Sequence, residues 1–591
     1  MTEAMMVPCP AMGTDARTGV SRGVLLCLLA VVGCDCGDDG GSDKLDDAST
    51  GSVPDGAVSS VDSGGVTKPP ECTPGAQTCS GGLATYCRSD GTLAGYECDP
   101  VQGLTCTPTG CRGACDLSEV ESSYIGCDYY PTVTLNPVFS AFSFAVAVSN
   151  TSTQSTHVTI TRGSTVVHDA NVAPNQLQTF NLPWVPELKG GDLVCTTPPA
   201  RGDSRLVAGG AYRVRTDKPV TVYQFSPLEY QLDPAPATCP SIKSQCEFSQ
   251  VEECFSYSND ASLLLPATAL TGNYTVLTYP SQSEGSGFIA VTGTEDNTQV
   301  EVFGAGVFAA GGGVDAAGKG KVRLDRGGVL ELVSGPEGDI SGTRIRADKP
   351  VQVLAGHSCA RVPNPQFGYC DHLEEVVFPE DTLGKKYIVT TPMFADGTTP
   401  SSYMLRIAGI ANDTHVRFDP AFRDPVTLRA GEFTESSIGG VAVGGDNPPN
   451  LLIESDKPIL IATYMVGQQA QPFPMSTVGD PSLSTAVPVE QYRESYLFTA
   501  PITYSVNLVT VVAKRGASVR VDGRVIPAAD FVPVGVGEYG VANVPLDNKT
   551  AVHSVTADQE VGLTVYGYGQ FTSYMYPGGA DLERIAVPIL I

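Results

Sequence analysis

The sequence predicts an all-β protein in which about four tandem β-sandwich-like modules follow a small disulfide-rich module. The chain of 591 residues has 64 glycines and 44 prolines, which is typical of many short strands joined by turns. One strand–turn–strand phrase recurs about every 100–130 residues, and each period has room for about six or seven strands, the size of a β-sandwich. A β-propeller-like arrangement is the alternative, although a blade uses only about 40–50 residues.

The recurring phrase reads YRVRTDKPVTVYQF at 212–225, TRIRADKPVQVLAG at 343–356 and LLIESDKPILIATY at 451–464, with a weaker copy, HSVTADQEVGLTVY, at 553–566. Equivalent aspartates should cap the turn in every copy: Asp217, Asp348, Asp456 and Asp558. A second phrase places a proline eight positions before a tyrosine that opens a strand: Pro266 and Tyr274, Pro379 and Tyr387, Pro488 and Tyr496. The two phrases predict β modules over residues 128–260, 261–370, 371–480 and 481–591.

Residues 1–33 have the form of an export signal of the lipoprotein type. Arg17 and Arg22 precede a short apolar run at 24–32, which Gly33 and Cys34 follow. This run is shorter than the ~20 residues that a transmembrane helix needs. Residues 31–34 resemble a bacterial lipobox, which implies cleavage before Cys34 and acylation of its thiol; an ordinary cleaved signal is the alternative. The candidate start residues are Met1, Met5, Met6 and Met12.

Residues 34–70 are rich in Asp, Gly and Ser and have almost no large apolar side chains. Such a segment does not bury enough apolar surface to offset the entropy of ordering, so it predicts a flexible acidic tether. Signal and tether together predict an exported protein that its N-terminal lipid anchors in the cell envelope, at the outer membrane or cell surface.

The eighteen cysteines form even groups once the signal, Cys34 and Cys36 are set aside. Eight lie in a predicted disulfide module at 71–127, four lie between Cys195 and Cys254, and the last two are Cys359 and Cys370. Even groups in separate segments predict local disulfides and an oxidising compartment. The sequence does not select a pairing for the eight. Zinc is the alternative there, but paired C-x₂-C knuckles are missing.

Charge and motifs count against two classes of function. A net charge of −28 leaves no general basic surface for nucleic acid phosphates. After the predicted signal, the sequence contains no G-x-S-x-G elbow, H-E-x-x-H motif or P-loop, so we predict no enzyme activity and no cofactor. A triad is recognised by its geometry, which keeps a cryptic hydrolase as an alternative. The Arg201-Gly202-Asp203 triplet is interpreted as a chance motif.

One segment resembles a known family. Residues 356–392 read GHSCARVPNPQFGYCDHLEEVVFPEDTLGKKYIVTTP, and the resemblance depends on Gly356, His357, Cys359, Cys370, Asp371 and His372, followed by the proline–tyrosine phrase. This combination is similar to the N-terminal domain of IgGFc-binding proteins, over about residues 128–480 and more weakly to the end. The resemblance implies an extracellular, β-rich, non-catalytic binding module.

The pairs His357-x-Cys359 and Cys370-x-His372 are nearly symmetric. Two thiolates and two imidazoles would suit tetrahedral zinc. Because thiols of exported proteins oxidise, we favour a Cys359–Cys370 disulfide that closes the insert RVPNPQFGY at 361–369, with no metal site.

These observations predict a cell-surface lipoprotein that acts as a non-catalytic binding or adhesion protein. Its expected partners are the membrane, through the N-terminal lipid, and a protein or glycan ligand, with no nucleic acid. The alternatives are a structural component of the envelope or extracellular matrix, and the cryptic hydrolase.

Overall fold

A computed structural model describes residues 72–88, 91–120, 123–150, 152–192, 202–233, 254–439, 450–470 and 478–586. The predicted signal, Cys34 and the tether lie outside these residues. The predicted fold class is confirmed, because the described chain is all-β: its helices are the four-residue α1 (Leu117–Val120) and α2 (Pro186–Lys189) and six 3-10 turns. No helix among the described residues is long and apolar enough to cross a membrane.

Disulfide bonds, rather than a large apolar core, hold the disulfide module together. Its strands are β1 (Gln77–Ser80), β2 (Leu83–Cys87) and β3 (Leu93–Glu97) in one sheet and the hairpin β4 (Thr105–Thr107) and β5 (Gly110–Arg112). Four disulfides join Cys72–Cys87, Cys79–Cys106, Cys98–Cys111 and Cys115–Cys127. Three of these sulfurs lie close enough to share a metal ion, but each is already in a disulfide.

Module 1 is organised around one long strand, β12 (Arg213–Ser226). Its first half pairs with β6 (Gly126–Tyr129) and β8 (Thr156–Arg162), and its second half pairs with β7 (Phe144–Asn150) and β15 (Asp260–Leu263). The sheet is completed by β9 (Thr165–Val172) beside β8 and β10 (Leu177–Leu182) beside β7. Two short strands, β13 (Gln231–Leu232) and β14 (Cys254–Phe255), form a separate pair.

Modules 2 and 3 each have an inner and an outer four-stranded sheet. In module 2 the inner strands are β21 (Val329–Ser334), β17 (Gly287–Gly293), β23 (Val351–Ala360) and β24 (Asp371–Val376), extended by β11 (Arg205–Val207) and β19 (Phe308–Ala309); the outer strands are β16 (Asn273–Thr275), β22 (Arg344–Ala347), β18 (Thr298–Phe303) and β20 (Lys319–Leu324). In module 3 the inner strands are β29 (Phe433–Ile438), β26 (Tyr403–Gly409), β31 (Ile459–Met465) and β32 (Ser482–Thr485); the outer strands are β25 (Lys386–Val389), β30 (Leu451–Ser455), β27 (Thr414–Asp419) and β28 (Val426–Leu428). Buried side chains of β25 and β30 pack against those of β26 and β31, as in a β-sandwich.

Module 4 repeats the plan of module 1 with the 18-residue strand β39 (Val552–Gly569). The first half of β39 pairs with β33 (Arg493–Thr499) and β35 (Val519–Val521), and the second half with β34 (Val506–Lys514) and β40 (Thr572–Pro577). The remaining strands are β36 (Arg524–Val525), β37 (Val532–Val534) and β38 (Tyr539–Pro545).

The recurring phrase carries the chain from the outer to the inner sheet in modules 2 and 3, and it joins the two halves of one continuous sheet in modules 1 and 4. It is broken by a turn in modules 2 and 3, between β22 and β23 and between β30 and β31. In modules 1 and 4 the predicted turn is wrong, because β12 and β39 run through it without interruption and change their pairing partners halfway. The repeated aspartates also act on a neighbouring hairpin, since each accepts a backbone N–H at 2.7–2.8 Å: Asp217 from His157, Asp348 from Gln299, Asp456 from His415 and Asp558 from Ser518.

The repeated tyrosines hold the same crossing from the other side. Each donates its hydroxyl to the carbonyl oxygen three residues after the repeated aspartate: Tyr274 to Val351, Tyr387 to Ile459 and Tyr496 to Val561, at 2.5–2.6 Å. Module 1 has a fourth such tyrosine, Tyr129, which donates to Val220 at 2.6 Å and which the proline spacing did not reveal.

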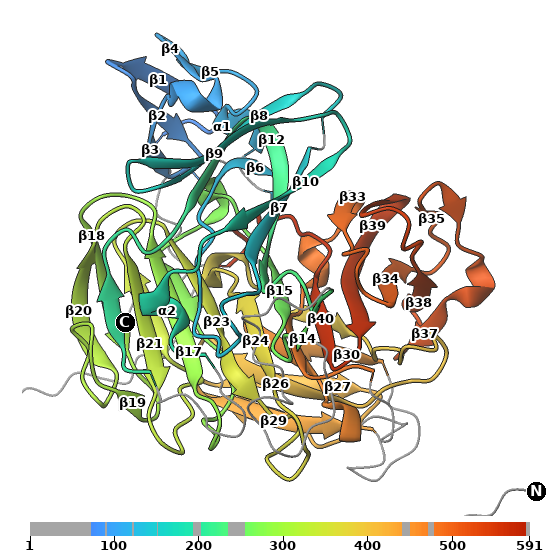
Figure 1. The fold of residues 1–591 in the computed structure, drawn as a ribbon. Helices are drawn as coiled ribbons and strands as arrows, with labels where there is room; N and C mark the ends of the chain where they lie inside the picture. The colour runs from blue at the N-terminus through green and yellow to red at the C-terminus, as the bar shows by residue number, and fades with distance from the viewer. Residues whose placement is uncertain are drawn as a thin grey trace, which may run out of the picture. The chain divides into compact units, whose positions relative to one another are not determined.

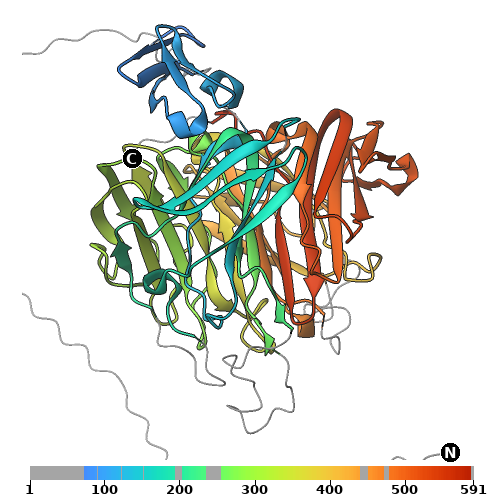
Figure 2. The same cartoon turned by 45° about the horizontal axis from the view of Figure 1, so that its top comes forward.

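The last strand of each module lies on a common axis. Strand β15 contacts β24, β24 contacts β32, β32 contacts β40, and β40 contacts β15. Figures 1 and 2 show the sheets of successive modules side by side, with β15, β24 and β40 meeting in the middle of Figure 1. The modules are therefore sandwich-like, and their arrangement around the axis is propeller-like. Pairing assigns β15, β24 and β32 to the preceding module, a few residues beyond the boundaries predicted at 260, 370 and 480.

Candidate functional site

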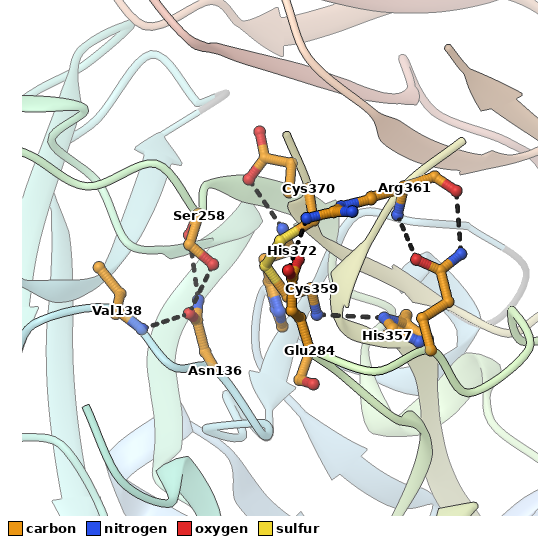
Figure 3. The surroundings of a disulfide bond; sticks show 12 residues. Asn136, Val138, Ser258, Glu284, His357, Cys359, Arg361, Cys370 and His372 are labelled. Carbon is orange, nitrogen blue, oxygen red and sulfur yellow. Dashed lines mark hydrogen bonds and ion pairs between the residues drawn. A yellow bond between two sulfur atoms is a disulfide. The ribbon is translucent and has the colours of Figure 1, made fainter. Parts of the chain in front are cut away.

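The segment that carries the family resemblance forms a disulfide-closed hairpin in module 2. Strand β23 ends in Gly356-His357-Ser358-Cys359-Ala360, the insert follows, and β24 begins at Asp371. Cys359 and Cys370 are joined by a disulfide with an S–S distance of 1.96 Å (Figure 3). We refer to residues 361–369 as the disulfide loop.

Gly356 and His357 shape the strand behind this loop. A Cβ atom at Gly356 would lie 1.7 Å from the carbonyl oxygen of Leu373, so no other residue fits without moving β24. The buried His357 ring accepts the backbone N–H of Cys359 through Nδ1 at 3.1 Å. The pairing of β23 and β24 shifts register between His357 and Ala360. These residues therefore set the bend from which the loop starts.

His372 lies in a buried polar network between modules 1 and 2. Its Nε2 is 3.3 Å from the Thr134 hydroxyl and 3.4 Å from Glu374 Oε2, and its ring stacks on Phe288. Glu374 accepts hydrogen bonds from Gln224 Nε2 at 2.6 Å and from the Thr134 hydroxyl. With Cys359 and Cys370 oxidised and Nδ1 of His357 already accepting a hydrogen bond, these residues build a structural core rather than the zinc site considered from sequence.

Three buried carboxyls lie where the axis strands begin. Asp260 Oδ2 accepts the backbone N–H groups of Glu374 at 2.9 Å and Leu483 at 3.2 Å, so it joins module 1 to modules 2 and 3. Burial raises the pKa of Asp260 well above its usual value. Burial, together with the nearby charges of Asp480 and Asp260, does the same to the pKa of Asp371. Such groups stabilise the fold most at acidic pH.

The disulfide loop is held from both sides while its tip faces outward. The side-chain amide of Gln282 and the backbone of Arg361 exchange two hydrogen bonds of 2.9 Å, and Arg361 forms a 2.5 Å ion pair with Glu284 (Figure 3). On the other side, Gln469 Oε1 accepts the N–H of Gly368 at 2.7 Å. Tyr369 is 57% exposed, and its backbone φ of 67° is unusual for a bulky residue.

A pocket of about 360 Å³ lies beside this hairpin. Ser283, Glu284, Gly285, Ser286 and Ser358 line it from module 2. The opposite wall comes from Leu135, Pro137, Pro186, Lys189, Gly190, Gly191, Gly202, Asp203 and Arg205. Beneath Arg205, the buried Glu331 lies 3.7 Å from the guanidinium, and burial raises its pKa to about 8.

The structure thus places the site residues that the sequence predicted in the interior of the protein rather than at its surface. Gly356, His357, Asp371 and His372 are buried, whereas Tyr369 is exposed, as are Asp203 and Ser283 of the pocket lining. Sequence reasoning missed the serines at 283–286, which sit in a polar loop without a recognisable motif. Of the cysteines between 195 and 254, Cys254 is disulfide-bonded, while Cys195, Cys239, Cys246 and also Arg201 lie outside the described residues.

Fold and site together define a disulfide-stabilised, all-β, multi-module protein. The family described as "IgGFc binding protein" matches residues 260–567, which is more than half of the chain, and the chain belongs to this family. It is 25% identical over 331 residues to the IgGFc-binding protein of Homo sapiens; the match covers 53% of this chain and 6% of the human protein. An anti-sigma factor domain-containing protein from Clostridium clariflavum aligns with a TM-score of 0.11 and 10% identity, over 57% of this chain and 89% of that one. A TM-score this low does not indicate a shared fold.

Proposed function

We propose that this chain is an exported surface protein that binds an extracellular protein or glycan through the disulfide loop and the surface around it, without catalysing a reaction. Its partner on the membrane side is the bilayer, through a lipid on Cys34, and nucleic acid is not a partner. Membership in a binding-type family and the name of the human relative support the binding role.

The observation that carries the proposal is Tyr369. An exposed tyrosine is a typical contact residue of protein interfaces. Here its backbone is held at a positive φ, which costs free energy for any residue with a Cβ atom and persists only where the surroundings impose it. The disulfide, Arg361 and Gly368 are the contacts that impose it. Such pre-ordering lowers the entropy lost on binding.

An array of extracellular proteins and glycans tests the proposal. The purified chain should bind one class saturably, and Tyr369→Gly should weaken that binding about tenfold, since glycine tolerates the positive φ while the whole tyrosine side chain is lost. Val536→Ser is the matched control, because Val536 is 84% exposed in a different module. Absence of saturable binding to either class would refute the binding role.

A second experiment tests the anchor. Metabolic labelling with palmitate should modify the wild-type chain, and Cys34→Ala should abolish the label and release the protein from the membrane fraction. A wild-type chain that takes up no label contradicts the lipid anchor and leaves the binding role standing.

A further inference from the structure

The pocket beside the disulfide loop has the volume and the polar lining of a small-ligand site. Its volume of about 360 Å³ suits one sugar ring with its substituents and is too small for a folded partner. We propose that this pocket binds a neutral sugar residue of a glycan. The inference rests on the proposed binding role and names the chemistry of the ligand.

Two serines present unused hydrogen-bonding capacity at the pocket wall. Ser286 is 1% exposed, and none of the residues that the structure describes forms a hydrogen bond with its hydroxyl. A buried hydroxyl left unpaired is unfavourable, so a ligand that pairs with it gains free energy. Ser358 Oγ accepts the N–H of Ser286 at 3.0 Å, which leaves the hydroxyl proton of Ser358 to donate. Both side chains line the pocket.

The charges of the lining favour a neutral ligand over an anion. Lys189 is already paired with Asp192 at 2.5 Å, and Glu284 is paired with Arg361. Arg205 lies 3.7 Å from the buried Glu331, and Asp203 is the other charged residue of the lining. Sugar hydroxyls both donate and accept, so they can pair with a guanidinium and a carboxylate together. A carboxylate or phosphate would instead meet the repulsion of Asp203.

The wall that carries the serines is ordered before any ligand arrives. The loop at 282–286 is hydrogen-bonded to Arg361 of the disulfide loop. Gly285 packs so closely on β23 that a Cβ atom there would lie 2.7 Å from the backbone nitrogen of Cys359. A wall of this kind loses little entropy when a small ligand binds, which is what a weak, single-sugar site needs.

Isothermal titration of the purified full chain with glucose, galactose, mannose and N-acetylglucosamine tests the inference. At least one of these sugars should bind, and Ser286→Ala and Asp203→Ala should each weaken it about tenfold. Because no described residue pairs with the Ser286 hydroxyl, Ser286→Ala should not lower the melting temperature below that of wild type. The matched control is Ser149→Ala in β7, another buried serine with an unpaired hydroxyl that does not line the pocket, and it should bind as wild type.

Three results would overturn the inference. The wild-type chain could bind none of the four sugars, or both pocket variants could bind as tightly as wild type, which would place the sugar elsewhere. Acetate or inorganic phosphate could bind, and bind more tightly to Asp203→Ala, which would identify an anion site. If the wild-type chain and Ser286→Ala capture the same array partner equally well and neither binds sugar, the inference fails while the proposed binding role stands.

Discussion

Asp260 is the residue whose replacement should most directly loosen the axis. Its carboxyl accepts the backbone N–H of its neighbour Ala261 at 2.9 Å and the hydroxyl of Ser482 at 2.8 Å on Oδ1. On Oδ2 it accepts the N–H groups of Glu374 and Leu483. The side chain is buried, and its partners lie as far as 223 positions away along the chain. We therefore expect Asp260→Asn and Asp260→Ala to destabilise several modules together.

The magnitude follows from the donors that each substitution leaves unpaired. Asparagine has one carbonyl oxygen, so its NH₂ group must face at least one backbone N–H, which costs about 1–3 kcal/mol. Alanine leaves three buried backbone N–H groups without an acceptor, and we expect a loss of about 3 kcal/mol or more in the free energy of unfolding. The ranking wild type, Asn, Ala is itself part of the prediction.

Urea unfolding measures how much stability each variant loses and whether several modules are destabilised together. Fluorescence of Trp184, the only tryptophan, reports on module 1, and far-UV circular dichroism reports on all the sheets. Both transitions should move to lower urea in the variants, and Asp530→Asn, at an exposed position, should unfold as wild type. A change of less than about 1 kcal/mol for Asp260→Ala would refute the reasoning, because three unpaired backbone donors would then cost almost nothing.

Three further outcomes follow from the same structure. Gly356→Ala should lower the free energy of unfolding by about 3 kcal/mol or more, measured by urea titration, because its methyl group would collide with the Leu373 carbonyl. Glu331→Gln should make stability less dependent on pH: the folded pKa of about 8 lies above the ordinary value of 4.5, so this group stabilises fully below about pH 4.5 and its contribution is lost as the pH rises through 8, which thermal unfolding from pH 4 to 9 would show. Arg406→Met should cost about 2–3 kcal/mol by urea titration, below the ~3–5 of a fully buried pair, because the Glu435 side chain that it pairs with at 2.7 Å is 40% exposed.

Each outcome has a result that contradicts it. Gly95→Ala is the control for Gly356, since a Cβ atom there meets nothing within 4 Å, and equal losses at the two glycines would contradict the steric argument. Parallel pH profiles of wild type and Glu331→Gln would mean that this carboxyl does not titrate differently on folding. Arg406→Lys keeps the charge, so it should retain part of the stability; a loss as large as that of Arg406→Met would show that the positive charge by itself contributes little.

Much of the fold can be predicted from local sequence patterns. Alternating apolar residues and the proline and glycine turns predict the strands, because strand periodicity and turn chemistry are local properties. The recurring phrase locates the crossing between the two sheets of modules 2 and 3 and the midpoint of the long strand in modules 1 and 4. It does not reveal that β12 and β39 continue through that crossing, because continuity depends on which neighbouring strands offer hydrogen bonds to each half.

Only part of the candidate site can be predicted from the sequence. Cys359 and Cys370 are 11 positions apart, and their disulfide follows from proximity in sequence and an oxidising compartment. The pocket brings together Asp203, Ser286 and Ser358, which come from separate strands and loops and have no shared motif. Local sequence patterns do not predict which residues from distant segments lie together in the folded chain.

The sequence by itself determined the class of fold, the repeat and the family, because periodicity, turn residues and cysteine spacing are encoded within a few dozen neighbouring residues. The tertiary structure decided what the family residues do. Only the ring of axis strands brings Asp260 to Glu374 and Leu483, and only that packing buries His357 and His372 while leaving Tyr369 exposed. The physical reason is that strands more than a hundred residues apart determine which side chains are buried and which hydrogen-bond partners they have. Until these strands pair, no side chain is assigned to the core or to the surface.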